Sequence, residues 1–348
     1  MIYKSPYPYF GGKSKVAARV WERLGNPANY VEPFFGSGAV LLARPDPEWR
    51  GAVETVNDAN GYVANFWRAL QADPDQVAHY ADWPALENDL HARHWWLVNR
   101  REHLRSRLEG DPDFYDAKAA GWWVWGMSLW IGSGFCETNG PWAVEDGKLV
   151  KTAGRGVQRQ LIHLGDAGRG VTRKLIHLGN AGQGVTRQLI HLGDAGLYGY
   201  LNGLAERMKR VRVACGDWTR LCGHSVTTSH SGITGIYLDP PYRAGGRDMG
   251  VYGSHDSVEI FDEVAAWAIA NGTHKRMRIA VSGYGDEDVM TAFAEAGWSA
   301  LRWKAAKGFG GQRKDGSNTN QHREVIWFSP HCLQSEAQEL PMFARMGL

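Results

Sequence analysis

The sequence predicts an α/β protein whose open sheet is interrupted by a long insertion. Short apolar runs alternate with segments of helical spacing in residues 1–72 and again in 197–330, and this alternation is typical of α/β sheets. The residues between them, 73–196, lack the alternation and end in a tandem repeat over 154–195. The chain has 348 residues, enough for two domains or for one domain with a large insertion. We therefore expect a sheet from the two outer segments, an insertion between them, and a loosely attached tail over 331–348.

In the first segment, residues 28–43 predict a strand, a glycine-containing tight turn and a helix, in that order. The other predicted elements are a strand over 51–60, a helix over 61–71, strands over 211–218, 232–242 and 278–284, a helix over 286–296, and a final strand pair over 299–306 and 323–329.

The insertion carries much of the unusual composition, including many of the 16 tryptophans of the chain. Residues 85–108 are predicted as one long basic helix. A second helix over 119–131 gathers four residues on one face, namely Trp122, Gly126, Leu129 and Trp130. Packing between helices is the favoured role for these tryptophans.

The tandem repeat consists of three contiguous copies of 14 residues, at 154–167, 168–181 and 182–195. Each copy holds a strand-like run followed by a turn rich in glycine. A unit this short cannot bury a core of its own, so we expect short strands and turns here.

Composition excludes several classes of protein. Hydrophobic residues make up 43% and charged residues 22%, as in ordinary globular proteins and unlike disordered ones. No apolar run reaches the ~18 residues of a membrane span, and residues 1–10 lack the charged start and apolar stretch of a signal peptide. The four cysteines form no Cys-x-x-Cys pair, which favours a reducing compartment over a disulfide framework or a zinc site. We expect a cytoplasmic protein with no membrane span and no metal.

The most informative motif follows a predicted strand: an apolar run at 236–238 leads into Asp239, Pro240, Pro241 and Tyr242. Ligands of open α/β sheets bind beyond the carboxyl ends of the strands. The two prolines fix the backbone and remove two N–H donors, so the Asp239 carboxylate and the Pro240 carbonyl remain as acceptors. This set suits an aromatic ring with an exocyclic amino group, because the acceptors take its two hydrogens and Tyr242 stacks on the ring.

Two glycine motifs lie in the first segment. The turn over 32–38 contains Gly36 and Gly38, which let the backbone approach a ligand next to the free N–H groups of a helix start. Position 41 is leucine, so the third glycine of a dinucleotide-binding fingerprint is missing. Residues 12–14 look like the end of a phosphate-binding loop, but the glycine required five positions before Gly12 is replaced by tyrosine, which argues against an ATPase.

In this order, the motifs resemble those of the Dam-type DNA adenine N6-methyltransferases of the alpha group. In that family a Gly-Gly-Lys motif precedes a Glu-Pro-Phe-x-Gly-x-Gly motif, a target-recognition segment and Asp-Pro-Pro-Tyr. Residues 57–58, 215–218 and 323–325 also fit, and the resemblance covers about 1–72 and 197–330. It implies a Rossmann-like S-adenosylmethionine-dependent methyltransferase sheet with an inserted target-recognition segment containing short tandem repeats. The tryptophan-rich helices and the triple repeat depart from the better-known members.

The resemblance implies S-adenosylmethionine as methyl donor and assigns residues by motif position. Tyr9 and Lys13 are expected to help close the cofactor pocket, and Asp58 to accept from the ribose hydroxyls. Asp217 is expected to accept from the adenine amine of the cofactor, with Trp218 either against that ring or in the core. The full set of expected cofactor-binding residues is Tyr9, Phe10, Gly12, Lys13, Glu32, Phe34, Gly36, Gly38, Asp58, Asp217 and Trp218.

The expected reaction is methylation of adenine N6 in double-stranded DNA. The N6 lone pair is delocalised into the ring, so hydrogen bonds to Asp239 and to the Pro240 carbonyl would favour a pyramidal nitrogen aimed at the donor methyl. Positioning supplies much of the remaining acceleration. Because N6 is buried in the duplex, the base has to be flipped into the pocket. Pro241 and Tyr242 complete the expected catalytic set.

Charge distribution supports a DNA partner. Residues 148–213 contain twelve Lys or Arg and three Asp or Glu, a net charge of +9, although 39 basic and 37 acidic residues nearly cancel over the whole chain. A basic patch of this kind is the expected footprint of phosphate contacts. The expected DNA-binding residues are Arg155, Arg159, Arg169, Arg173, Lys174 and Arg187.

Two alternatives remain open at this stage. Cytosine N4 presents the same exocyclic amine to an Asp-Pro-Pro-Tyr site, although the motif order favours adenine. A DNA-binding protein with an inert methyltransferase core is a third interpretation, against which the intact Asp239, Lys13 and Gly36 argue.

Overall fold

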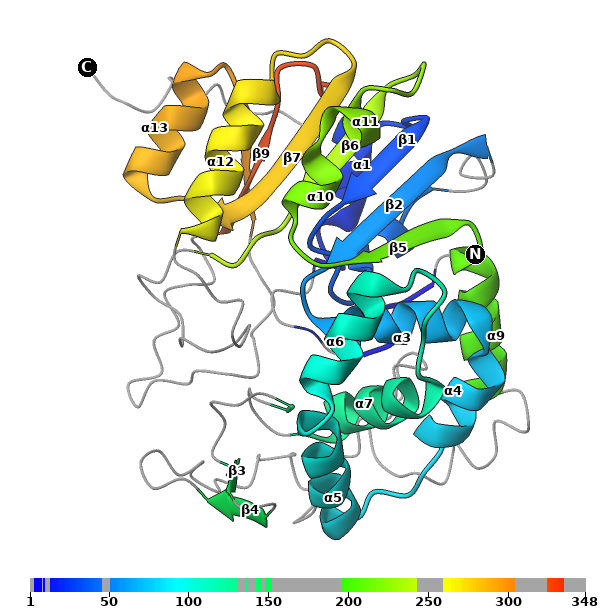
Figure 1. The fold of residues 1–348 in the computed structure, drawn as a ribbon. Helices are drawn as coiled ribbons and strands as arrows, with labels where there is room; N and C mark the ends of the chain where they lie inside the picture. Colours follow the sequence, from blue (N-terminus) through cyan, green and yellow to red (C-terminus); the bar gives the residue numbers. More distant parts are fainter. Residues whose placement is uncertain are drawn as a thin grey trace, which may run out of the picture.

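The computed structural model shows a seven-stranded sheet with packed helices on both of its faces (Figure 1). The structure describes residues 3–7, 9, 13–45, 51–130, 135–136, 142–145, 148–151, 196–242, 259–303 and 324–334, with the backbone alone at 142–145 and 148–151.

The sheet is mostly parallel and has the strand order β5-β2-β1-β6-β7-β9-β8. Only β9 is reversed, pairing antiparallel with both β7 and β8. The strands are β1 (Asn29–Glu32), β2 (Val53–Asp58), β5 (Val211–Cys215), β6 (Thr234–Leu238), β7 (Met277–Tyr284), β8 (Ser299–Arg302) and β9 (Glu324–Phe328). A separate hairpin joins β3 (Trp142–Glu145) and β4 (Lys148–Lys151).

The order of the strands reverses between β1 and β6. From β1 the chain builds outward through β2 to β5, and it then returns to place β6 on the other side of β1. Such a reversal leaves a crevice at the carboxyl ends of the two central strands, which is where open α/β sheets bind ligands. Glu32 ends β1 and Asp239 follows β6, so both carboxylates lie at this crevice.

Both faces of the sheet are covered, and every residue of the central strands β1 and β6 is buried. Tyr30 and Tyr237 belong to the core on one face, whereas Val31 and Ile236 belong to the core on the other. Successive side chains of a strand point to opposite faces, so each central strand contributes to both cores.

The helices fall into two groups. In Figure 1, α12 and α13 lie beside β7 and β9, while α3–α7 and α9 gather below the sheet with the β3–β4 hairpin next to α5. The helices are α1 (Ala17–Leu24), α2 (Ala39–Leu42), α3 (Gly61–Ala72), α4 (Pro74–Ala81), α5 (Glu87–Val98), α6 (Arg101–Gly110), α7 (Ala117–Leu129), α9 (Leu197–Met208), α10 (Thr219–Cys222), α11 (His224–Thr227), α12 (Ile260–Asn271) and α13 (Glu287–Glu295). Among the described helices, none is long and apolar enough to cross a membrane.

The predicted α/β sheet is confirmed, and so are its individual elements outside the insertion. The predicted strand–turn–helix corresponds to β1 and α2, followed by β2 and α3, and the later predicted strands are β5, β6 and β7. The predicted helix over 286–296 is α13, and the final strand pair is β8 with β9. Helices α1, α9 and α12 were not predicted. The tandem repeat at 154–195 lies outside the described residues.

The prediction of one helix over 85–108 is wrong, because the segment forms α5 and α6 with a break at Asn99 and Arg100. At the break, the carbonyl of Leu97 accepts from the Arg100 amide at 2.9 Å and from the Tyr62 hydroxyl at 2.7 Å. The Asn99 side chain donates to the Trp95 carbonyl at 2.8 Å, which caps the end of α5. A side chain from α3 therefore takes part in ending α5, and spacing within 85–108 cannot show this.

The tryptophans of 73–196 pack between helices as predicted, and α7 is buried over most of its surface, including Gly126 and Leu129 of the predicted face. Trp123 and Trp125 of α7 are almost fully buried, whereas the predicted Trp122 is only partly buried. Several of the indoles also make cation–π contacts. The Arg93 guanidinium lies 4.1 Å from the ring centroid of Trp125, and the Lys118 ammonium lies 4.4 Å from the ring centroid of Trp122. Basic side chains and indoles thus share the packing of α5 and α7.

A buried ion cluster ties β2 to two distant segments. Glu54 accepts from Arg44 at 2.9 Å and from Arg207 at 2.7 and 2.9 Å, and all three side chains are at most 5% exposed. Arg44 also donates to the carbonyl of Pro27 at 2.7 Å. The single carboxylate is therefore shared by two guanidinium groups that are almost entirely buried.

Substituting Glu54 with alanine should lower the free energy of unfolding by about 3–5 kcal/mol, because it leaves two buried cations without a carboxylate partner. Urea titration followed by circular dichroism measures this. The matched control is Glu206→Ala, which removes an exposed pair with Lys209 and should cost under about 1 kcal/mol. Similar losses in the two variants would show that the cluster adds no more than a surface pair.

Candidate functional site

The crevice between β1 and β6 brings together the residues that the sequence predicts as catalytic. Asp239 follows β6 and keeps 19% of its side chain exposed, while Pro240, Pro241 and Tyr242 are buried. Proline at two successive positions leaves no backbone N–H at this end of the strand, so the polar groups offered there are hydrogen-bond acceptors. The site thus presents a carboxylate and a rigid backbone at the point where the fold predicts a ligand.

A buried ion pair occupies the centre of this site. The ammonium of Lys13 lies 3.0 Å from Asp239 Oδ2, and its side chain is 4% exposed. It also lies 5.1 Å from the centroid of the Tyr242 ring. Burial raises the pKa of Asp239 above its ordinary value, and the charge of Lys13 opposes that rise. The pair brings the segment before α1 onto the carboxyl end of β6.

The Tyr242 ring is held in place from two sides. Its hydroxyl donates to Asp239 Oδ1 at 3.3 Å. Its ring meets that of Tyr284, at the end of β7, edge to face with centroids 4.7 Å apart. Tyr284 was not predicted, although its position at the carboxyl end of a predicted strand places it at the correct edge of the sheet.

Glu32 lies beneath this centre and is 2% exposed. The hydroxyl of Tyr30 donates to Glu32 Oε2 at 2.8 Å. Burial raises the pKa of Glu32 well above its usual range, and the Asp239 charge adds to this, whereas the Tyr30 bond lowers it. The carboxyl group is therefore a buried, hydrogen-bonded part of the crevice floor.

The glycine turn between β1 and α2 forms the second part of the site. Gly36 has φ +50° and Gly38 φ +71°, values that side chains other than glycine rarely adopt. A Cβ at Gly36 would lie 2.7 Å from the Tyr9 ring, so that ring rests directly on the turn. The carbonyl of Gly36 accepts from Tyr7 at 2.7 Å and from Trp67 at 3.0 Å. The turn thus lies against Tyr9 at Gly36 and against Phe35 and Trp67 at Gly38.

Asp58 joins the turn to the start of α3. Its two carboxylate oxygens accept from the amides of Gly36 and Asn60, each at 2.8 Å. Burial raises the pKa of Asp58 to about 6, while these two hydrogen bonds lower it. Next to it, the Asn57 side chain donates to the carbonyls of Pro33 and Gly216, which ties three strand ends together. The carboxylate is fixed and retains lone pairs for further donors.

Asp217 and Trp218, which follow Gly216 after the end of β5, differ in their surroundings. Asp217 is exposed, and its carboxylate accepts from the amide of Thr219 at 2.9 Å and from the hydroxyl of the same residue. Trp218 is 6% exposed, stacks on Phe34 with ring centroids 6.2 Å apart, and meets Trp267 edge to face. Trp218 and Phe34 therefore belong to the packing beside the glycine turn.

Glu324 is a site residue that sequence reasoning did not single out. It begins β9, is 8% exposed, and is paired in register with Tyr284. Burial raises its pKa and so does the Asp239 charge, whereas Lys13 lowers it. The motif at 323–325 was noted only as a family match, and nothing in that motif shows which residues lie across the crevice.

Several predicted residues lie outside the described part of the chain. They are Phe10 and Gly12 of the expected cofactor site, and Arg155, Arg159, Arg169, Arg173, Lys174 and Arg187 of the expected DNA-binding set. Within the described residues, no group of three or more His, Cys, Asp or Glu side chains is arranged to hold a metal ion.

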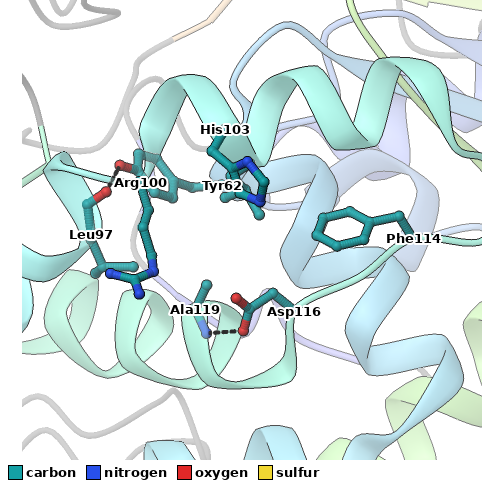
Figure 2. Close-up of a pocket in the computed structure, with 8 residues that line it drawn as sticks. Tyr62, Leu97, Arg100, His103, Phe114, Asp116 and Ala119 are labelled. Atoms are coloured by element: carbon teal, nitrogen blue, oxygen red, sulfur yellow. Dashed lines mark hydrogen bonds between the residues drawn. The ribbon is translucent and has the colours of Figure 1, made fainter.

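A separate cleft of about 150 Å³ lies among α3, α5, α6 and α7 (Figure 2). Two hydrogen bonds span its wall: Tyr62 donates to the Leu97 carbonyl, and the Asp116 carboxylate accepts from the Ala119 amide at 2.8 Å. None of the predicted site residues lines this cleft. The predicted site residues that the structure describes lie instead at the crevice at the sheet edge, and we take that crevice as the candidate site.

Comparison with known proteins finds one family model that matches part of the chain. Residues 9–106 match the family model described as D12 class N6 adenine-specific DNA methyltransferase. The matched segment contains Tyr9, Lys13, the glycine turn and Asp58, and it ends before the Asp-Pro-Pro-Tyr motif. No curated protein matches the chain. The match confirms the resemblance drawn from the motifs over residues 9–106, and it supports an adenine-specific DNA methyltransferase.

Proposed function

We propose that the protein transfers a methyl group from S-adenosylmethionine to the exocyclic N6 of adenine in a specific double-stranded DNA sequence, after flipping the base. Adenine methylation follows from the family, while the target sequence, the flipping step and the residue roles are our proposal. The observation that carries the roles is the placement of Asp239 and Pro240 at the strand reversal, opposite the glycine turn. The family match also favours adenine over cytosine N4 as the methylated base.

The residues around the glycine turn fit the expected cofactor. The Tyr9 ring packs against Gly36 where a Cβ would otherwise lie, so this aromatic side chain and the end of β1 border the same part of the crevice. Asp58 supplies a fixed carboxylate at the end of β2, which suits the hydroxyls of a ribose. Asp217 supplies an exposed acceptor after β5. When bound, S-adenosylmethionine supplies a methyl group activated on a sulfonium.

The reaction needs acceptors for an amine more than it needs a strong base. Adenine N6 is a poor nucleophile because its lone pair is delocalised into the ring. Acceptors at Asp239 and at the Pro240 carbonyl hold the two amino hydrogens and favour the pyramidal nitrogen that attacks the methyl group. Holding nitrogen and methyl in line removes much of the entropic barrier. The buried Tyr242 ring next to Asp239 is suited to stack on the flipped base.

We further propose that the basic segment at 148–213 binds the DNA backbone. Its net charge of +9 stands out from a nearly neutral chain, and arginine and lysine side chains are the usual partners of phosphates. The target-recognition role of the insertion and the domain limits at 73–196 belong to the same proposal.

Expression in a host without adenine methylation tests the overall function. Sequencing of the host DNA with detection of modified bases should find N6-methyladenine in one short sequence context. Absence of N6-methyladenine, or N4-methylcytosine in its place, would contradict the proposal.

Asp239→Ala should reduce methyl transfer to less than about a tenth of the wild-type rate, because a charge-assisted hydrogen bond to the reacting amine is lost. Transfer of tritiated methyl groups to unmethylated plasmid DNA measures the rate. Cofactor binding, measured by calorimetry, should fall less. Asp113→Ala makes the same change at an exposed loop position and serves as control. A rate near that of wild type in Asp239→Ala would remove this residue from the catalytic set.

Cofactor affinity should depend on the charge of Asp58. Its pKa of about 6 means that the carboxyl is ionised above this pH and protonated below it. Ribose hydroxyls donate to the ionised form, so calorimetric affinity for S-adenosylmethionine should weaken as pH falls from about 8 to about 5. Asp58→Asn should bind more weakly at neutral pH by about 1–3 kcal/mol and lose the acid dependence. An unchanged pH profile in this variant would place the ribose elsewhere.

Deletion of residues 168–181 removes one copy of the repeat and, with it, Arg169, Arg173 and Lys174. If these side chains contact phosphates, DNA affinity should fall and its dependence on salt should become shallower, by a slope of roughly 0.9 per lost contact. The methylated sequence should stay the same, because phosphate contacts position the protein and do not read bases. Filter binding over a salt series and modified-base sequencing measure the two effects. A changed target sequence with an unchanged slope would instead assign base reading to the repeats.

A further inference from the structure

Each carboxylate oxygen of Asp239 already accepts one donor in this structure. Lys13 lies on Oδ2 at 3.0 Å, and the Tyr242 hydroxyl donates to Oδ1 at 3.3 Å. The amine of a target base needs one of these oxygens as its acceptor. The ammonium is the stronger competitor, because its charge-assisted bond is shorter and is shielded from water.

A second carboxylate lies across the same edge of the sheet. Glu324 begins β9 and is paired in register with Tyr284, whose ring contacts that of Tyr242. Its Oε2 atom is buried and has no hydrogen-bond partner among the described residues. A buried carboxylate oxygen without a donor is unfavourable, and such an atom in a folded protein calls for an explanation.

Among the charged groups that affect Glu324, Lys13 is the cation that could pair with its carboxylate. Those that influence its pKa are Lys13, before α1, which lowers it, and Asp239, after β6, which raises it. On the two central strands, the Asp239 charge raises the pKa of Glu32, and the charges of Asp239 and Glu324 both raise the pKa of Tyr237. Lys13 is thus paired with Asp239 and lies close enough to Glu324 to lower the pKa of that carboxyl group.

We propose that Glu324 is a positioning residue that receives the Lys13 ammonium when the target base enters, and so releases Asp239 Oδ2 to accept the hydrogen bond from N6. The inference rests on the proposed function, since it concerns the acceptor assigned to the target amine. The move exchanges one carboxylate partner of the lysine for another and transfers no proton, so the net charge of the crevice stays constant. A lysine suits this exchange, because its ammonium has three donors on a flexible stem.

Glu324→Gln tests the proposal by removing the charge and keeping the shape. The single-turnover rate of methyl transfer to unmethylated plasmid DNA should fall on the order of tenfold, since the ammonium then stays on Asp239. Cofactor affinity by calorimetry and the thermal midpoint should change little. Glu295→Gln makes the same chemical change at an exposed position of α13 and should behave as wild type.

The pH profile separates this role from a merely structural one. In the wild type the rate should decline as falling pH protonates Glu324, whose pKa is raised, because the neutral acid cannot hold the ammonium. In Glu324→Gln that decline should move to lower pH, since Asp239 loses a neighbouring negative charge. Glu324→Asp, which keeps the charge but shortens its reach, should be slow and should keep the acid decline.

A double-mutant cycle with Lys13→Gln completes the test. If Glu324 acts through the lysine, Glu324→Gln should cause little further loss in the Lys13→Gln background. Additive losses, or a wild-type rate and pH profile in Glu324→Gln, would overturn the role of Glu324 while leaving the methyltransferase activity intact. Failure of the wild-type protein to methylate adenine would instead overturn the proposed function, and with it the role assigned to Glu324.

Discussion

The ion pair between Lys13 and Asp239 is the interaction on which the crevice depends. The edge of the sheet gathers Asp239, Glu32 and Glu324 in a largely buried space, and burial alone raises the pKa of each. Carboxylates brought this close disfavour one another's ionised form. A single ammonium, 4% exposed, supplies the compensating charge and at the same time fastens the segment before α1 across the strand ends. Charge balance and chain path are therefore set by the same contact.

The glycine turn between β1 and α2 is the second feature that holds the crevice together. The backbone of Gly36 donates to Asp58 and accepts from Tyr7 and Trp67, so one residue links β2, α3 and the N-terminal segment. Its positive φ lets both groups point to their partners without a side chain in the way. Tyr7 and Trp67, which hold the Gly36 carbonyl, lie outside the proposed catalytic and cofactor-binding set, and support of this kind is what a precise binding site requires.

The sequence predicted the strands and the motifs well, and the physical reason is local. The alternation of strand and helix around β1, β2 and α3 can be recognised within short segments of sequence, and so can the Asp-Pro-Pro-Tyr motif after β6. The break between α5 and α6 was missed because the hydroxyl of Tyr62, from another helix, takes the carbonyl of Leu97.

The features that were not predicted share that dependence on distant partners. Glu54 stands in a strand where an apolar residue is expected, and only its contacts with Arg44 and Arg207 explain the burial. Glu324 likewise resembles an ordinary strand residue until β7 and β6 place it near Asp239. Contacts between residues far apart in the chain leave no periodic pattern in the sequence, so a single sequence does not show them.

The position of β1 in the centre of the sheet has a consequence for synthesis of the protein. One of its neighbours, β2, follows it directly, but the other is β6, and the contact of Asn29 with Thr234 closes a separation of 205 residues. At about 5–20 residues per second, roughly ten to forty seconds pass on the ribosome before that partner strand emerges. During this interval the open edge of β1 is a template for wrong pairing, and long-range parallel pairing is slow in any case. The tandem repeats lie within this stretch, so each copy lengthens the time for which the nascent chain depends on dilution or chaperones.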